Sequence, residues 1–127
     1  MEESQEKGDL QSKEYKKAVE EMLKTYGKDG IDKAMDEHKL DAIIAPSGGP
    51  SWKTDLINGD NFMLSSSVYA ALSGYPNINV PMGFVGEVPV GICFFGRAWS
   101  EPVLLEIAYA YEQGTHHRKA PRFIKTD

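Results

Sequence analysis

The apolar residues in the first third of the chain recur every three or four positions, as on one face of an α-helix. Over residues 12–26 this stripe consists of Tyr15, Val19, Met22, Leu23 and Tyr26. Ser12 suits the N-cap and Gly27 suits the end, so we predict a helix over residues 12–26. A shorter second helix follows, with the stripe Ile31, Ala34, Met35 and His38. His38 is therefore expected to be partly packed.

Three later segments have the patterns of β-strands. Residues 41–46 form a short, unbroken apolar run closed by Pro46, which predicts a strand buried on both faces. Apolar residues alternate with others over residues 78–84 and again over 88–95, with a Gly-Glu turn between them. This pattern is typical of an antiparallel hairpin, in which Cys93 would be a small core residue.

Two more helices are predicted in the second half of the chain. The serines at 65–67 precede a short helix over residues 68–73, which Gly74 ends. The last helix follows Ser100 and is expected to stop at Gly114. Its inward stripe consists of Leu104, Ile107, Ala108 and Tyr111.

The predicted elements follow the order α-α-β-α-β-β-α, without an internal repeat. This order indicates an α/β fold in which helices pack on a sheet of about three strands. A length of 127 residues suits one domain. Polar and charged residues dominate positions 1–11, which we expect to be a flexible lead-in to a domain over residues 12–127.

Residues 51–64 form a long connection with no clear periodicity. Its Asn58-Gly59 pair predicts a tight turn with positive φ. Connections of this length are often functional or contact a partner. The alternative is a surface loop in which Trp52 and Phe62 fold back as packing anchors, and the sequence leaves both interpretations open.

Composition narrows the possible functions. The chain has 14 Lys and Arg against 19 Asp and Glu, a formal net charge of -5, which argues against a dedicated nucleic-acid binder. Only Cys93 is available for disulfides, so a reducing cytoplasm is expected. No apolar run reaches the roughly 18 residues of a membrane span, and the charged beginning is not that of a secretory signal.

A cluster of basic residues stands near the end of the sequence. Its members are Arg118, Lys119, Arg122 and Lys125. Such a segment can bind an anionic partner, but apolar residues interrupt this one. We therefore favour a solvated terminus.

The residue types that carry catalysis do not form a complete set. The single cysteine and three histidines lack the spacing of a metal site, and no dinucleotide or P-loop motif is present, so we expect no metal and no cofactor. The serines at 65–67 lack a nucleophile-elbow motif and suit helix capping. A pairing with Lys53 is the one alternative that would give a nucleophilic serine its base.

Several segments, taken together, resemble the C-terminal part of amidase signature enzymes. They occur in that family's order and spacing between residues 40 and 123. The segments are Leu40-Asp-Ala-Ile-Ile-Ala-Pro46, Trp52-Lys-Thr-Asp-Leu-Ile-Asn-Gly-Asp60, Gly74-Tyr-Pro-Asn-Ile-Asn-Val-Pro-Met-Gly-Phe84, Pro89-Val-Gly-Ile-Cys-Phe-Phe-Gly-Arg97, Trp99-Ser-Glu-Pro-Val-Leu-Leu-Glu106, Ala108-Tyr-Ala-Tyr-Glu-Gln113 and Arg118-Lys-Ala-Pro121.

The resemblance implies hydrolysis of carbon–nitrogen amide bonds through an acyl-enzyme. The family uses a nucleophilic serine, a second serine in a cis peptide that relays the proton, and a lysine base. These belong to an upstream Gly/Ser-rich signature that nothing in these 127 residues matches. We therefore assign no catalytic residue, and expect a C-terminal fragment or subunit that is inactive alone.

The resemblance also implies a fragment of the family's large mixed sheet. Such a fragment would expose a strand edge and apolar surface. We expect it to form a homo-oligomer or to join an upstream amidase polypeptide. The alternatives are a non-catalytic interaction or ligand-binding module derived from the amidase fold, and a small enzyme built on Ser/Lys chemistry.

The predicted substrate-contacting residues are Ser47, Trp52 and Asp55. They follow the predicted strand over residues 41–46. Ligands of open α/β sheets often lie beyond the carboxyl ends of strands. These residues are expected to contact an amide substrate in the complete enzyme rather than to catalyse its hydrolysis.

Overall fold

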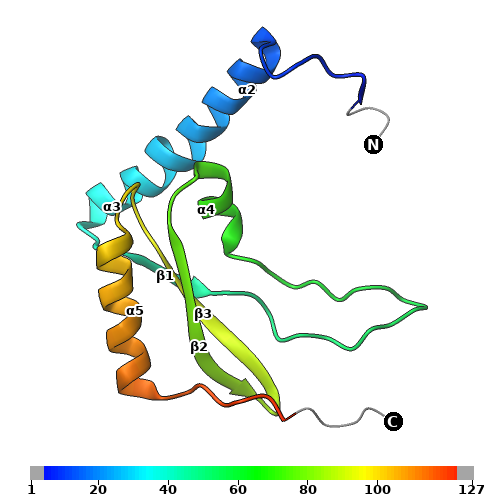
Figure 1. Ribbon diagram of the computed structural model, residues 1–127, viewed down its shortest axis with the longest axis vertical. Helices are drawn as coiled ribbons and strands as arrows, with labels where there is room; N and C mark the ends of the chain where they lie inside the picture. Colours follow the sequence, from blue (N-terminus) through cyan, green and yellow to red (C-terminus); the bar gives the residue numbers. More distant parts are fainter. Residues whose placement is uncertain (1–4, 123–127) are drawn as a thin grey trace.

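The computed structural model describes residues 5–122, and its first long element is a helical rod (Figure 1). Helix α2 (Lys13–Leu23) runs without interruption into the π-helix η1 (Lys24–Asp32), which continues as α3 (Lys33–His38). Ser12 is the N-cap, and its Oγ accepts a 3.2 Å hydrogen bond from the Tyr15 backbone N–H. The rod ends at Lys39, which adopts the left-handed conformation with a φ of 52°.

The predicted helix end at Gly27 is wrong. Gly27 is buried within η1, and a Cβ added there would lie 3.0 Å from the hydroxyl oxygen of Tyr75. The glycine therefore permits a close approach between the rod and a segment far away in the sequence, instead of ending the helix. The expected partial packing of His38 is also wrong, because His38 is exposed.

The sheet has three strands in the order β1-β3-β2. They are β1 (Ile43–Pro46), β2 (Asn77–Val85) and β3 (Val88–Phe95). The predicted β2–β3 hairpin is confirmed, with a register shift between Pro81 and Gly83. The α/β class and the three strands are also confirmed. Both strand pairings are antiparallel. A fragment of a mixed sheet was expected, and within residues 5–122 this fragment contains only antiparallel pairs.

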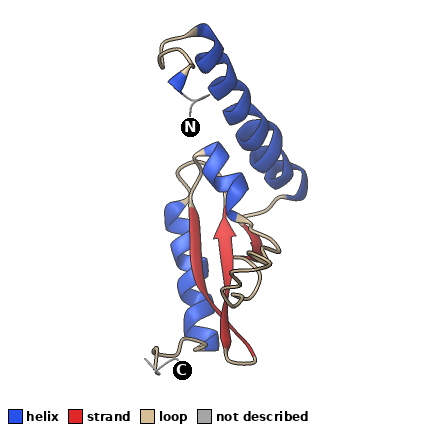
Figure 2. Cartoon of the chain, turned by 90° about the vertical axis from the view of Figure 1, so that its right-hand side faces the viewer, coloured by secondary structure: helices blue, strands red, loops and turns tan. Residues whose placement is uncertain are grey.

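Helices pack on both faces of this sheet, and the rod lies toward one end of its strands (Figure 2). On one face, Cys93 and Phe95 pack with residues of the rod and of α4 (Ser67–Ser73), namely Ile31, Met35 and Ala70. On the other face, Phe94 packs against α5 (Glu101–Thr115) through Leu104 and Ala108. Cys93 is 2% exposed, which confirms its place in the core.

The prediction that the first strand is buried on both faces is wrong. Burial alternates along β1, and Ile44 is 62% exposed. β1 is the outer strand beside β3, and within residues 5–122 no helix covers the side chain of Ile44. The apolar run therefore supplies one partly buried face, through Ile43 and Ala45, and one exposed face.

Helices α4 and α5 lie where the sequence placed them. Gly74 ends α4 in the left-handed conformation with a φ of 73°. Helix α5 continues through Gly114 to Thr115 and is capped by His116, so the predicted stop at Gly114 is early. Its stripe is confirmed, because Leu104 and Ala108 are 1% and 2% exposed.

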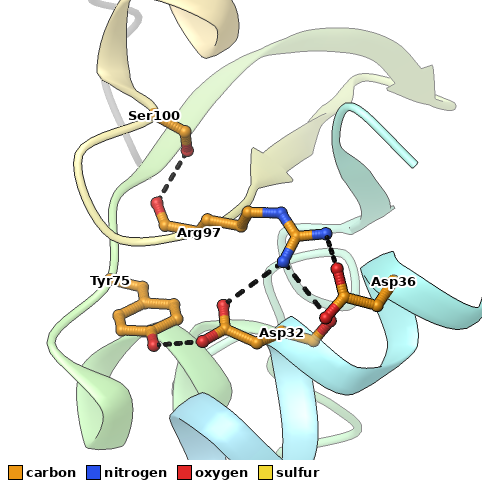
Figure 3. Close-up of polar contacts among 5 residues, drawn as sticks. All are labelled: Asp32, Asp36, Tyr75, Arg97 and Ser100. Atoms are coloured by element: carbon orange, nitrogen blue, oxygen red, sulfur yellow. Dashed lines mark hydrogen bonds and ion pairs between the residues drawn. The ribbon is translucent and has the colours of Figure 1, made fainter. Parts of the chain in front are cut away.

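A polar cluster joins the end of β3 to the rod (Figure 3). Arg97 Nη2 lies 2.7 Å from Asp36 Oδ1, and Arg97 Nη1 lies 3.9 Å from Asp32 Oδ1. Tyr75 donates a 2.8 Å hydrogen bond to Asp32 Oδ2. Ser100 Oγ donates to the Arg97 backbone oxygen at 2.8 Å. These contacts fix the rod relative to the sheet and to the start of α5.

Two residues of the basic segment contact the end of the hairpin. Lys119 Nζ lies 4.7 Å from the centre of the Phe84 ring, and Arg122 Nη2 lies 3.0 Å from Glu87 Oε1. Lys125 lies outside the described residues. Two of the four basic residues, Lys119 and Arg122, thus have partners on the hairpin. The expectation that the basic segment is a solvated terminus stays a prediction.

Candidate functional site

The candidate site begins where β1 ends. The Ser47 backbone N–H donates to the Gly91 oxygen at 2.9 Å, which continues the β1–β3 ladder. Ser47 Oγ donates a hydrogen bond to Asn79 Oδ1 on β2, so the two side chains meet across β3. Gly91 makes this possible, because a Cβ there would lie 2.6 Å from Ser47 Oγ and 3.1 Å from Asn79 Oδ1. Ser47 and Asn79 therefore form a polar site on the sheet, above Gly91.

A second polar group lies between β1 and the start of α4. Ser66 is 8% exposed, and its Oγ donates a 2.7 Å hydrogen bond to the Pro46 oxygen. The same hydroxyl lies 2.9 Å from Cys93 Sγ. Buried polar groups require such partners. Ser66 therefore satisfies a carbonyl at the edge of the sheet, although its side chain makes no hydrogen bond to the helix it precedes.

The serines at 65–67 are predicted to cap a helix, with a pairing to Lys53 as the alternative that would make one of them a nucleophile. Ser65 Oγ and Ser67 Oγ lie 2.7 Å apart and bond to each other. Within residues 5–122, the hydrogen-bond partners of the three hydroxyls are serine, cysteine and backbone groups, and include no lysine or histidine. Lys53 is exposed on the 51–64 segment. The described contacts therefore do not provide a base that could take a proton from these serines.

Residues 51–64 leave the end of β1, run away from the sheet and return to α4 (Figure 1). We call this segment the arm. Trp52 Nε1 donates a 3.1 Å hydrogen bond to Asp60 Oδ1. The Trp52 and Phe62 rings meet edge to face with centroids 6.3 Å apart. These contacts hold the outgoing and returning parts of the arm together, so Trp52 and Phe62 pack on each other within it.

Asp55 forms the turn of the arm. Its Oδ1 accepts 2.9 Å hydrogen bonds from the backbone N–H groups of Ile57 and Asn58, and its Oδ2 accepts one from the Asn58 amide. The hydrogen bond from the Asn58 backbone is the largest cause that lowers the pKa of Asp55 below its ordinary value of 3.8. Gly59 has a φ of 80°, which confirms the positive-φ turn predicted for this pair.

The three predicted substrate-contacting residues occupy two different places. Ser47 lies on the sheet with Asn79 and Gly91, whereas Trp52 and Asp55 lie in the arm. Each has its own hydrogen-bond partner, and within residues 5–122 no hydrogen bond joins Ser47 to either arm residue. Sequence reasoning missed Asn79 and Gly91. The alternation of β2, which places polar Asn79 between apolar Ile78 and Val80, was the available signal.

No three His, Cys, Asp or Glu side chains within residues 5–122 are arranged to hold a metal ion. No helix in the same range is long and apolar enough to cross a membrane.

Comparison with known proteins identifies homologous sequences, although no family model matches the chain. A probable amidase of Arabidopsis thaliana is 44% identical over 112 residues, which are 87% of this chain and 19% of that protein. A glutamyl-tRNA(Gln) amidotransferase subunit of Methanosarcina barkeri is 34% identical over 115 residues, covering 86% of this chain and 23% of that protein. The chain thus spans about a fifth of the length of these curated relatives.

Solved structures match most of the chain's fold. A complex of the peptide amidase PAM with the competitive inhibitor chymostatin has a TM-score of 0.89 and 43% identity, over 95% of this chain and 25% of that one. Native peptide amidase from Stenotrophomonas maltophilia has a TM-score of 0.86 and 42% identity, over 97% of this chain and 24% of that one. A glutamyl-tRNA(Gln) amidotransferase subunit from Thermotoga maritima has a TM-score of 0.66 and 27% identity, over 83% of this chain and 23% of that one.

Proposed function

Because this chain belongs to the amidase signature family, we propose that it forms the C-terminal portion of an enzyme that hydrolyses carbon–nitrogen amide bonds. The observation that carries the proposal is the match to peptide amidase, which extends over 95% of this chain at 43% identity and accounts for 25% of that enzyme. This chain would supply part of the sheet and helices. The catalytic residues would come from the remaining portion.

In the complete enzyme, a serine hydroxyl supplied by that portion would attack the amide carbonyl carbon. The lysine base would accept the hydroxyl proton through the second serine, and the amine would leave with a proton. Water would then cleave the acyl-serine ester, releasing the acid and restoring the hydroxyl. This chain alone would be inactive, since loss of a serine nucleophile can cost on the order of 10⁶ in turnover.

The separation of the predicted contact residues suggests different roles for them. Ser47 directly follows β1, and its hydroxyl lies over the sheet at Gly91. It would contact the substrate together with Asn79, its hydrogen-bond partner. Trp52 and Asp55 would act indirectly, because their side chains hold the shape of the arm. The cytoplasmic location is still a prediction from the single cysteine.

The test is to co-express this chain with the upstream three quarters of Stenotrophomonas maltophilia peptide amidase and to measure release of ammonia from a peptide amide. We expect hydrolysis by the pair and none by either polypeptide alone. Stable pairing without hydrolysis would favour a non-catalytic module. Hydrolysis by this chain alone, abolished by Ser65→Ala or Lys53→Ala, would overturn the proposal in favour of a self-sufficient enzyme.

A further inference from the structure

The arm combines internal order with unusual exposure of apolar side chains. Leu56 and Ile57, which lie within its turn, are 95% and 92% exposed. Phe62 and Met63 are each 67% exposed on the returning part. Single exposed apolar residues are common on protein surfaces, but a contiguous group marks an interaction site.

The turn that presents these side chains is built by specific contacts. The Asp55 carboxylate accepts three hydrogen bonds within the turn. The Gly59 backbone N–H donates a fourth, at 3.1 Å, to the Asp55 backbone oxygen. Trp52 and Asp60 close its base. Leu56 and Ile57 are therefore held outward by a shaped turn, and a partner that covers them meets a surface that is already ordered.

The distribution of other exposed apolar residues indicates what the partner is. Leu105 and Tyr109 on α5 are 57% and 66% exposed, and Ile44 at the sheet edge is 62% exposed. Helix α5 and the arm lie on opposite sides of the sheet in Figure 1. A two-fold contact between identical chains uses one patch on each copy, whereas these residues occupy several sides. One large polypeptide that wraps the chain covers them better than a second copy does.

We propose that the arm is a docking element whose turn, through Leu56 and Ile57, is received by the remaining portion of the amidase polypeptide. This inference rests on the proposed function. The size of the partner fits, because the matching solved enzyme has about three quarters of its chain outside the part that this chain matches.

The test compares two double variants in the co-expressed pair. Leu56→Ser/Ile57→Ser removes the apolar turn. Leu10→Ser/Leu23→Ser is the matched control, because its residues are 66% and 44% exposed but lie outside the arm. Each purified pair is diluted, and dissociation is followed by the anisotropy of a label at the amino terminus of this chain. We expect the arm variant to weaken pairing on the order of 100-fold and the control to pair like the unaltered chain.

Circular dichroism of each isolated chain checks folding, which neither variant should alter, because all four side chains are exposed. Equal pairing by the arm variant and the unaltered chain, or an equal loss in the control, would overturn the docking role while leaving the proposed function intact. The isolated chain could also self-associate, and the arm variant could abolish that self-association. This result would overturn the docking role as well, because the arm would then bind a second copy of this chain. Failure of the unaltered chain to pair and to restore hydrolysis would overturn both proposals.

Discussion

Tyr75 donates a 2.8 Å hydrogen bond to Asp32 Oδ2, which joins the segment before β2 to the π-helix. The two residues are 43 positions apart in the sequence. Asp32 also faces Arg97 at the end of β3. This bond therefore connects the helical rod, the approach to β2 and the sheet at one point (Figure 3).

Removing the Tyr75 hydroxyl should weaken the fold. We expect Tyr75→Phe to lower the free energy of unfolding by about 1–2 kcal/mol, because a part-buried hydrogen bond to a carboxylate is lost. Urea unfolding followed by circular dichroism measures the change. Tyr109→Phe is the matched control, because Tyr109 is 66% exposed, and it should have little effect. Equal losses of unfolding free energy in the two variants would contradict a stabilising role for the Tyr75–Asp32 hydrogen bond.

The same hydroxyl should make stability depend on alkaline pH. Burial, then the hydrogen bond to Asp32 and its negative charge, raise the pKa of Tyr75 above its ordinary value of 10.0, while Arg97 lowers it. The folded state thus keeps a proton that the unfolded chain releases. The stabilisation is complete below about pH 10 and is lost as pH rises through the folded pKa.

The measurement is the free energy of unfolding from about pH 9 to about pH 12 for the unaltered chain and Tyr75→Phe. The difference between the two proteins should shrink as pH rises within this range. Comparing them removes the contribution of the other tyrosines. A difference that stays constant with pH would show that Tyr75 titrates alike in the folded and unfolded states.

Replacement of two helical glycines by alanine should change the stability of the fold in opposite directions. A Cβ at Gly30 would lie 2.9 Å from the Thr25 backbone oxygen, whereas a Cβ at Gly114 would meet nothing within 4 Å. We expect Gly30→Ala to destabilise the fold by about 1–3 kcal/mol through this clash. Gly114→Ala should stabilise it by about 0.5–1 kcal/mol by restricting the unfolded chain. Thermal unfolding distinguishes the two, and a stabilising Gly30→Ala would contradict the geometry of η1.

The elements that sequence reasoning located well are those with strong local periodicity. The β2–β3 hairpin and the buried stripe of α5 follow from alternation and from helical spacing. The end assigned to Gly27 failed because its backbone continues through a π-helix and packs against Tyr75, which is far away in the sequence. Local propensity cannot reveal such a contact. The exposed side of Ile44 was missed for a similar reason, because an apolar run does not show which face its neighbours cover.

The candidate site was predicted less completely than the fold. Ser47 was predicted to contact substrate because it follows a strand end, and this role is still a prediction. Its hydrogen-bond partner Asn79 is 32 residues away in the sequence. Their meeting depends on the strand order β1-β3-β2, which places β3 between them. Trp52 and Asp55 were predicted by the same rule, because their loop follows that strand end. Their contacts with Asp60 and Asn58 in the arm required the structure.

Gly91 should be coupled energetically to Ser47. A Cβ at Gly91 would lie 2.6 Å from Ser47 Oγ, so Gly91→Ala is expected to cost about 1–3 kcal/mol. Ser47→Ala alone should cost about 0.5–1.5 kcal/mol, because the hydrogen bond to Asn79 is lost. In the double variant the clashing oxygen is absent, so the total loss should be smaller than the sum of the single losses.

Urea unfolding of the four proteins completes a double-mutant cycle. Recovery should be incomplete, because the Cβ would still lie 3.1 Å from Asn79 Oδ1 and 3.3 Å from its Nδ2. Additive losses would mean that Ser47 does not occupy the space above Gly91. A coupled result would establish that the missing side chain at Gly91 is what lets Ser47 and Asn79 meet across β3, at the position where we propose that substrate binds.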